Sequence, residues 1–118
     1  MISVKNGIVN IHRGDDGAIP VLIMCKGQPY HMQEGDKLTF TVRELPDHSS
    51  PVLLRVESDE DIILLTHEQT VQIPVGKYSC DVQLTRANGM VTTVFPCLKG
   101  KGCTCNLKNF IVDAEVSD

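Results

Sequence analysis

The apolar residues of this chain recur at every second position through most of its length, and this spacing limits the possible fold more than any other feature. In the segment KLTFTVRE, Leu38, Phe40 and Val42 alternate with polar residues. The segments 51–58, 77–86 and 109–114 show the same alternation. Because successive side chains of a β-strand point to opposite faces of the sheet, this period is typical of strands with one buried face.

The residues between these segments predict how the strands are connected. The pair Asn88–Gly89 separates two alternating segments and tolerates positive φ, so it predicts a hairpin with strands over 78–86 and 90–96. The segment 18–25 is apolar on both faces and predicts a more central strand, although Pro20 removes one backbone donor. We expect at most one short helical turn, near 66–73. The whole pattern predicts a single-domain, all-β, antiparallel β-sandwich over residues 1–118, immunoglobulin-like or jelly-roll-like, with about seven to nine short strands.

Composition excludes several classes of function. The chain has 118 residues, enough for one domain, and its 11 Lys and Arg against 15 Asp and Glu give a net charge of −4. A mildly acidic surface without a basic stripe repels a phosphate backbone, so we expect no nucleic-acid partner. No apolar run approaches the ~18 residues of a membrane span. The first residues lack a signal-peptide pattern, so we expect synthesis in the cytoplasm, where the five cysteines stay reduced.

The segment HRGDDG contains a cell-adhesion tripeptide, Arg13–Gly14–Asp15, and the Gly–Asp–Asp string of polymerases. A chain of 118 residues without a secretion signal fits neither function. We interpret the segment as a tight turn in which Gly14 takes positive φ and Asp15 caps free backbone amides. The four histidines are scattered, and no serine or glycine motif of catalysis is present. We therefore expect a protein that is not an enzyme and has no cofactor.

Three of the five cysteines, Cys97, Cys103 and Cys105, lie within nine residues of one another. A structural zinc site needs four ligands, and no fourth ligand follows nearby. Neighbouring lysines would favour thiolates. A metal site, a redox-sensitive loop and an incidental hairpin loop all remain open, and the incidental loop is favoured. Cys25 and Cys80 have the pattern of small core residues.

The order of these motifs resembles the N-terminal domain of phage baseplate upper proteins. The resemblance is carried by residues 8–23, 35–44, 75–94 and 110–118. It includes the Arg13–Gly14–Asp15 turn and a Gly–Asp pair before a threonine-rich strand. Its most recognisable part is a Gly-x-Tyr-x-x-Asp-x-Gln pattern before a glycine hairpin, here Gly76, Tyr78, Asp81, Gln83, Asn88 and Gly89. Cys80 stands where the family has a second tyrosine, and residues 97–108 lengthen the last connection.

The resemblance implies a non-enzymatic structural protein of a phage or prophage tail. Its partners would be copies of itself and other baseplate proteins, and after synthesis in a bacterium it would reside in the virion. One alternative is a carbohydrate-binding β-sandwich module, although the aromatic residues that could form a sugar platform, Tyr30 among them, are few and mostly expected to face inward. A less favoured alternative is a small zinc protein that uses Cys97, Cys103 and Cys105.

Overall fold

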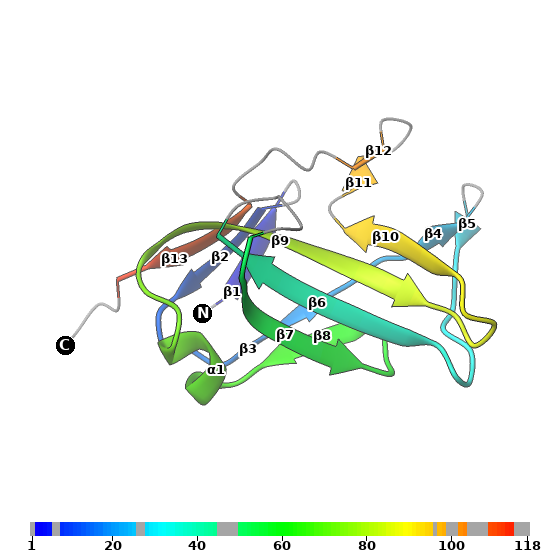
Figure 1. The fold of residues 1–118 in the computed structure, drawn as a ribbon, viewed down its shortest axis with the longest axis horizontal. Helices are drawn as coiled ribbons and strands as arrows, with labels where there is room; N and C mark the ends of the chain where they lie inside the picture. Colours follow the sequence, from blue (N-terminus) through cyan, green and yellow to red (C-terminus); the bar gives the residue numbers. More distant parts are fainter. Residues whose placement is uncertain are drawn as a thin grey trace.

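The computed structural model describes residues 2–5, 8–25, 28–44, 50–95, 97–98, 102–103 and 109–114. The architecture is all-β, and the prediction of a β-sandwich is confirmed (Figure 1). Nine of the described strands have four or more residues, which agrees with the expected number, and four further strands have two residues each. None of the helices in these ranges is long and apolar enough to cross a membrane.

A large sheet forms one layer of the sandwich. Its order is β1 (Ile2–Lys5), β2 (Ile8–His12), β13 (Phe110–Asp113), β9 (Gly76–Thr85), β6 (Lys37–Arg43) and β7 (Val52–Ser58). A seventh strand, β10 (Val91–Phe95), pairs with the second half of β9. The long strands β9, β6 and β7 run through the middle of the molecule, with β1, β2 and β13 gathered at one end (Figure 1).

The expectation of a purely antiparallel sandwich is wrong at one place. β13 pairs antiparallel with β9 but parallel with β2, so that Phe110 lies opposite both Tyr78 and Val9. A parallel pair needs a long crossover between its two strands. Here most of the domain lies between β2 and β13 in the sequence and provides this connection, which local alternation of apolar residues does not reveal.

The second layer is smaller. β3 (Gly17–Pro20) pairs with β8 (Ile62–Leu65), and β4 (Met24–Cys25) pairs with β5 (Gln28–Pro29). The expected central strand over 18–25 is therefore divided, and Leu22 between β3 and β4 is 71% exposed. Pro20 is the last residue of β3 and lies opposite Ile62, and the Val21 N–H after it still donates a 2.9 Å hydrogen bond to the Asp61 carbonyl. A third small pair, β11 (Cys97–Leu98) and β12 (Gly102–Cys103), follows β10.

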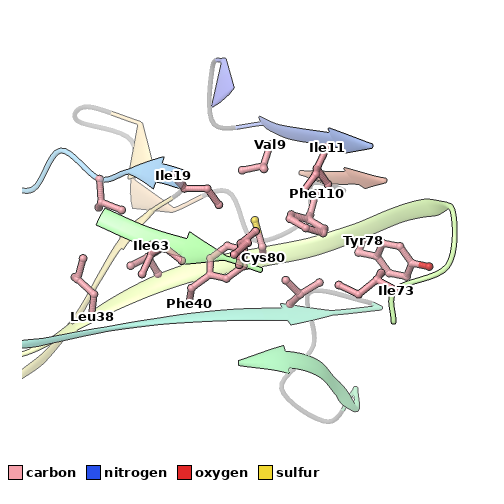
Figure 2. Close-up of a cluster of buried hydrophobic side chains, with 14 of the residues drawn as sticks. Val9, Ile11, Ile19, Leu38, Phe40, Ile63, Ile73, Tyr78, Cys80 and Phe110 are labelled. Atoms are coloured by element: carbon pink, nitrogen blue, oxygen red, sulfur yellow. The ribbon is translucent and has the colours of Figure 1, made fainter. Parts of the chain in front are cut away.

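The core lies between the two layers and is mostly aliphatic. From the large sheet, Leu38, Phe40 and Val42 of β6 face Ile19 of β3 and Ile63 of β8, as Figure 2 shows for the labelled members. The rings of Phe40 and Phe110 pack at 5.9 Å between centroids. Burial of each such side chain contributes about 1.5–3 kcal/mol. Leu38, Phe40 and Val42 are buried as the alternation predicted, whereas Val52 of the alternating segment 51–58 is 40% exposed and Ser79, predicted to face outward, is 6% exposed.

The expected helical turn is α1 (His67–Val71), which forms because its first turn is capped. The Thr66 hydroxyl accepts a hydrogen bond from the Gln69 N–H, and the Gln69 side chain accepts one from the Thr66 N–H. This reciprocal capping box satisfies two donors that a helix start leaves without partners.

The hairpin between β9 and β10 is also confirmed. Val91 lies opposite Thr85, and the Gly89 N–H donates to the Arg86 carbonyl to close the turn. Gly89 has φ +90°, a conformation that favours glycine. The Asn88 side chain accepts a hydrogen bond from the Met90 N–H at 3.0 Å. Gly89 therefore has the role that the sequence predicts.

Candidate functional site

A shallow polar groove lies on the outer face of the large sheet, across β7, β6 and β9. It has a volume of about 270 Å³ and is lined by Thr39, Thr41, Arg43, Arg55, Glu57, Asp81 and Gln83. These are the outward residues of strands whose alternate side chains enter the core. The sequence motif had drawn attention to Asp81 and Gln83 but not to the residues of β6 and β7 that lie beside them.

The register of the three strands explains the shape of the groove. Thr39 lies between Glu57 and Gln83, and Thr41 lies between Arg55 and Asp81. At these two positions the central strand carries threonines, and the two flanking strands carry longer side chains. Thr41 is only 8% exposed although it is on the outer face. The threonines form the floor of the groove and the longer side chains form its walls.

Two of the charged residues at the groove are held by contacts to neighbouring elements. The Arg43 guanidinium donates a 2.8 Å hydrogen bond to the Ser50 carbonyl. The Glu57 carboxylate forms an ion pair at 3.1 Å with Lys37, which is next to the groove on β6. Both side chains of this ion pair are about half exposed, so the pair is worth little in stability but orients the carboxylate.

The Arg13–Gly14–Asp15 turn lies against α1. Gly14 takes φ +88°, as expected. The Gly14 carbonyl is hydrogen-bonded to the His67 ring, and the Asp15 carbonyl accepts a hydrogen bond from the Thr70 hydroxyl at 2.9 Å. The Asp16 carboxylate accepts a hydrogen bond from the His67 N–H at the start of the helix, and the expected capping of backbone amides by Asp15 stays a prediction. These contacts join the turn to a helix more than fifty residues later.

Gly76 and Tyr78 form a tyrosine corner at the start of β9. The Tyr78 hydroxyl donates a 2.6 Å hydrogen bond to the Pro74 carbonyl, four residues upstream, and its ring is buried. A Cβ on Gly76 would approach the Tyr78 oxygen at 3.3 Å and two ring carbons at 3.5 Å. The Gly-x-Tyr spacing therefore allows the ring to lie over a residue without a side chain.

A second cluster joins the loop before β6 to the β9–β10 hairpin. Asp36 accepts hydrogen bonds from the Tyr30 hydroxyl at 2.5 Å, the Gln33 N–H at 2.9 Å and the Ala87 N–H at 3.1 Å. The Tyr30 hydrogen bond, followed by the Gln33 one, holds the pKa of Asp36 below its usual value. The Arg86 guanidinium lies 4.7 Å from the centre of the Tyr30 ring. Tyr30 is thus engaged in this cluster and is not among the residues that line the groove.

Cys80 is the one cysteine whose side chain lies in the described part of the chain. Cys80 is buried and has a free thiol, and burial, with a smaller effect of the Asp81 charge, raises its pKa. Cys97 lies opposite Cys103 in the register of β11 and β12, whereas Cys105 is outside the described residues. Within those residues, no three His, Cys, Asp or Glu side chains are placed to hold a metal ion. The metal-site alternative for Cys97, Cys103 and Cys105 stays a prediction.

Comparison with known proteins gives no relative: no model of a protein family matches the chain, and no curated protein matches it. The resemblance to baseplate upper proteins thus remains a prediction from the motifs.

Proposed function

We propose that this chain is a non-enzymatic structural protein of a phage or prophage tail, of the baseplate type, which acts through contacts with copies of itself and with other tail proteins. The first support comes from the motifs that carry the resemblance to the N-terminal domain of baseplate upper proteins. Gly14, Gly76, Tyr78 and Gly89 each have a conformational or packing role in the fold. A motif that specifies a fold is what a family of assembly domains would share.

The observation that carries the proposal is the edge of the sheet at β10. This strand pairs with β9 along one side, and no other described strand pairs with it. Met90 and Val91, where the strand begins, are 56% and 57% exposed. An edge strand presents unpaired N–H and C=O groups that can pair with a strand of another chain, and exposed apolar side chains strengthen such a contact.

The proposal predicts self-association that depends on this edge. Sedimentation velocity and light scattering over a range of protein concentrations should show reversible oligomers. Val91→Lys should weaken the association at least about tenfold, since lysine on an edge strand opposes strand pairing. Leu22→Lys is the matched control, because it makes the same change at a more exposed apolar residue outside the strands.

Association with other tail proteins is measured by pull-down with tagged protein from induced lysogens, followed by mass spectrometry. Recovery of phage structural proteins, reduced by Val91→Lys and retained by Leu22→Lys, is the expected result. A protein that stays monomeric at high concentration and recovers no tail component would overturn the proposal.

A further inference from the structure

The polar groove across β7, β6 and β9 has no role in the proposed edge contact, and its chemistry indicates a ligand of its own. It is a hollow in a sheet face, because Thr39 and Thr41 on the central strand are shorter than the residues on either side. Ligand pockets for drug-sized molecules have volumes of roughly 300–1,000 Å³. A volume of about 270 Å³ therefore suits a smaller ligand, of the size of a single ring with its substituents.

The charges of the lining select against ions. Arg43 and Arg55 line the groove together with Glu57 and Asp81, two groups of each sign, and Lys37 beside the groove is ion-paired with Glu57. An anion in the groove would lie close to the two carboxylates, and a cation would lie close to the two guanidinium groups. A neutral ligand avoids both repulsions.

The hydrogen-bonding groups of the lining specify the kind of neutral ligand. Arginines only donate, and carboxylates only accept, whereas the threonine hydroxyls and the Gln83 amide do both. A ligand that satisfies this mixture must offer several donors and acceptors close together. Each hydroxyl of a sugar is both a donor and an acceptor, and neighbouring hydroxyls of a ring offer them in pairs.

We propose that this groove binds a neutral pyranose sugar. Asp81 and Glu57 accept hydrogen bonds from the sugar hydroxyls, Arg55 and Arg43 donate to them, and Thr39 and Gln83 contact the ring substituents. No aromatic residue is among those that line the groove, so there is no stacking contribution to affinity. A single sugar therefore binds in the millimolar range, and a polysaccharide binds more tightly when several copies of the protein engage it together.

The test is a titration of the ¹⁵N-labelled protein with methyl glycosides of glucose, galactose and N-acetylglucosamine up to about 50 mM, followed by NMR chemical shifts. At least one glycoside should shift amide signals of β6, β7 and β9 near the groove in a saturable manner. Glucuronate and glucosamine, which carry opposite charges on a similar ring, should bind more weakly. A second titration with bacterial cell-wall polysaccharide distinguishes a polymer ligand from a free sugar.

Arg55→Gln tests the groove directly, because Arg55 is exposed and its replacement removes the guanidinium charge and most of its N–H donors without opening the core. It should weaken sugar binding at least about fivefold, and Arg13→Gln, the same change at an exposed residue of the Gly14 turn, should leave binding unchanged. Gln83→Ala is a second groove variant. Absence of saturable shifts, shifts confined to other regions, or tighter binding of a charged sugar would overturn the proposal.

Discussion

The buried side chain of Asn109 forms hydrogen bonds with β9 at a point of the large sheet between two paired strands. β13 pairs with the beginning of β9 and β10 pairs with its second half, and Cys80 lies between these two regions. The Asn109 amide donates to the Cys80 carbonyl at 2.9 Å and accepts from the Cys80 N–H at 2.7 Å. The Asn109 carbonyl also accepts a hydrogen bond from the Val9 N–H. The Asn109 side-chain amide, with its two hydrogen bonds to Cys80, therefore takes the place of a peptide group in the hydrogen-bond ladder beside β9.

Replacement of Asn109 by Ala should be strongly destabilising. It leaves the buried N–H and C=O of Cys80 without partners, and each unsatisfied group costs about 1–3 kcal/mol. We expect a loss of roughly 2–5 kcal/mol in urea unfolding, seen as a lower midpoint with a similar slope. Asn109→Asp should also be destabilising, because it loses the donor and buries a charge.

Asn10→Ala is the control for this prediction, since Asn10 is a half-buried asparagine on the neighbouring strand β2. It should change stability much less. If the two alanine variants unfolded at the same urea concentration, the amide of Asn109 would have no special role.

The Asp36 cluster predicts a dependence of stability on pH. Because the pKa of Asp36 is lower in the folded protein than its ordinary value, the carboxylate stabilises the fold above the unfolded-state pKa of about 3.9. This contribution is lost as the pH falls through the lower folded-state value. Asp36→Asn should therefore reduce stability at neutral pH, and the difference from the unmodified protein should shrink below about pH 4.

Urea midpoints measured from pH 7 down to pH 3 test this expectation, with Asp59→Asn at an exposed turn as the control. The control should match the unmodified protein at every pH. A difference for Asp36→Asn that is constant across this range would rule out the charge of Asp36 as the cause.

At the scale of elements, the sequence predicted strands and turns well wherever the information is local. The β9–β10 hairpin and the capped helix α1 follow from residues within a few positions of one another. The strand over 18–25 was predicted wrongly as continuous and central, because an apolar run does not reveal which strands are available to pair with it. Only part of the groove could be predicted from the sequence, since its residues come to lie on one face through the register of three separate strands.

The tyrosine corner gives a prediction at this scale. Tyr78→Phe removes the hydrogen bond to the Pro74 carbonyl and should cost about 1 kcal/mol. Gly76→Ala should also be destabilising, because its Cβ crowds the Tyr78 oxygen. The cost of Gly76→Ala should be smaller when residue 78 is already Phe, which a double-mutant cycle of urea unfolding measures. If the free-energy changes of the two substitutions were additive, the absence of a side chain at Gly76 would not be required for the packing of Tyr78.

At the scale of the whole molecule, the all-β class and the inward residues of β6 could be predicted from alternation, but the order of strands could not. β13 lies in the middle of the large sheet, between β2 and β9, although it is the last described strand in the sequence. The order of the strands is determined by how the complete inner faces of the two layers pack against each other across the core. Asn109, next to β13, was missed for the same reason: its bonds join Cys80 and Val9, which are distant in sequence.

The position of β13 also has a consequence for how the protein folds during synthesis. Until this strand leaves the ribosome, the pair β1–β2 and the strands β9, β6, β7 and β10 have no hydrogen-bonded link to each other within the large sheet. Both edges that β13 will occupy are then exposed in the nascent chain. Contacts between residues as far apart as Val9 and Phe110 form slowly, because a long loop must close first. The nascent chain therefore passes through a stage in which two incomplete sheets could recruit a strand from a neighbouring copy, and insertion of β13 ends that stage.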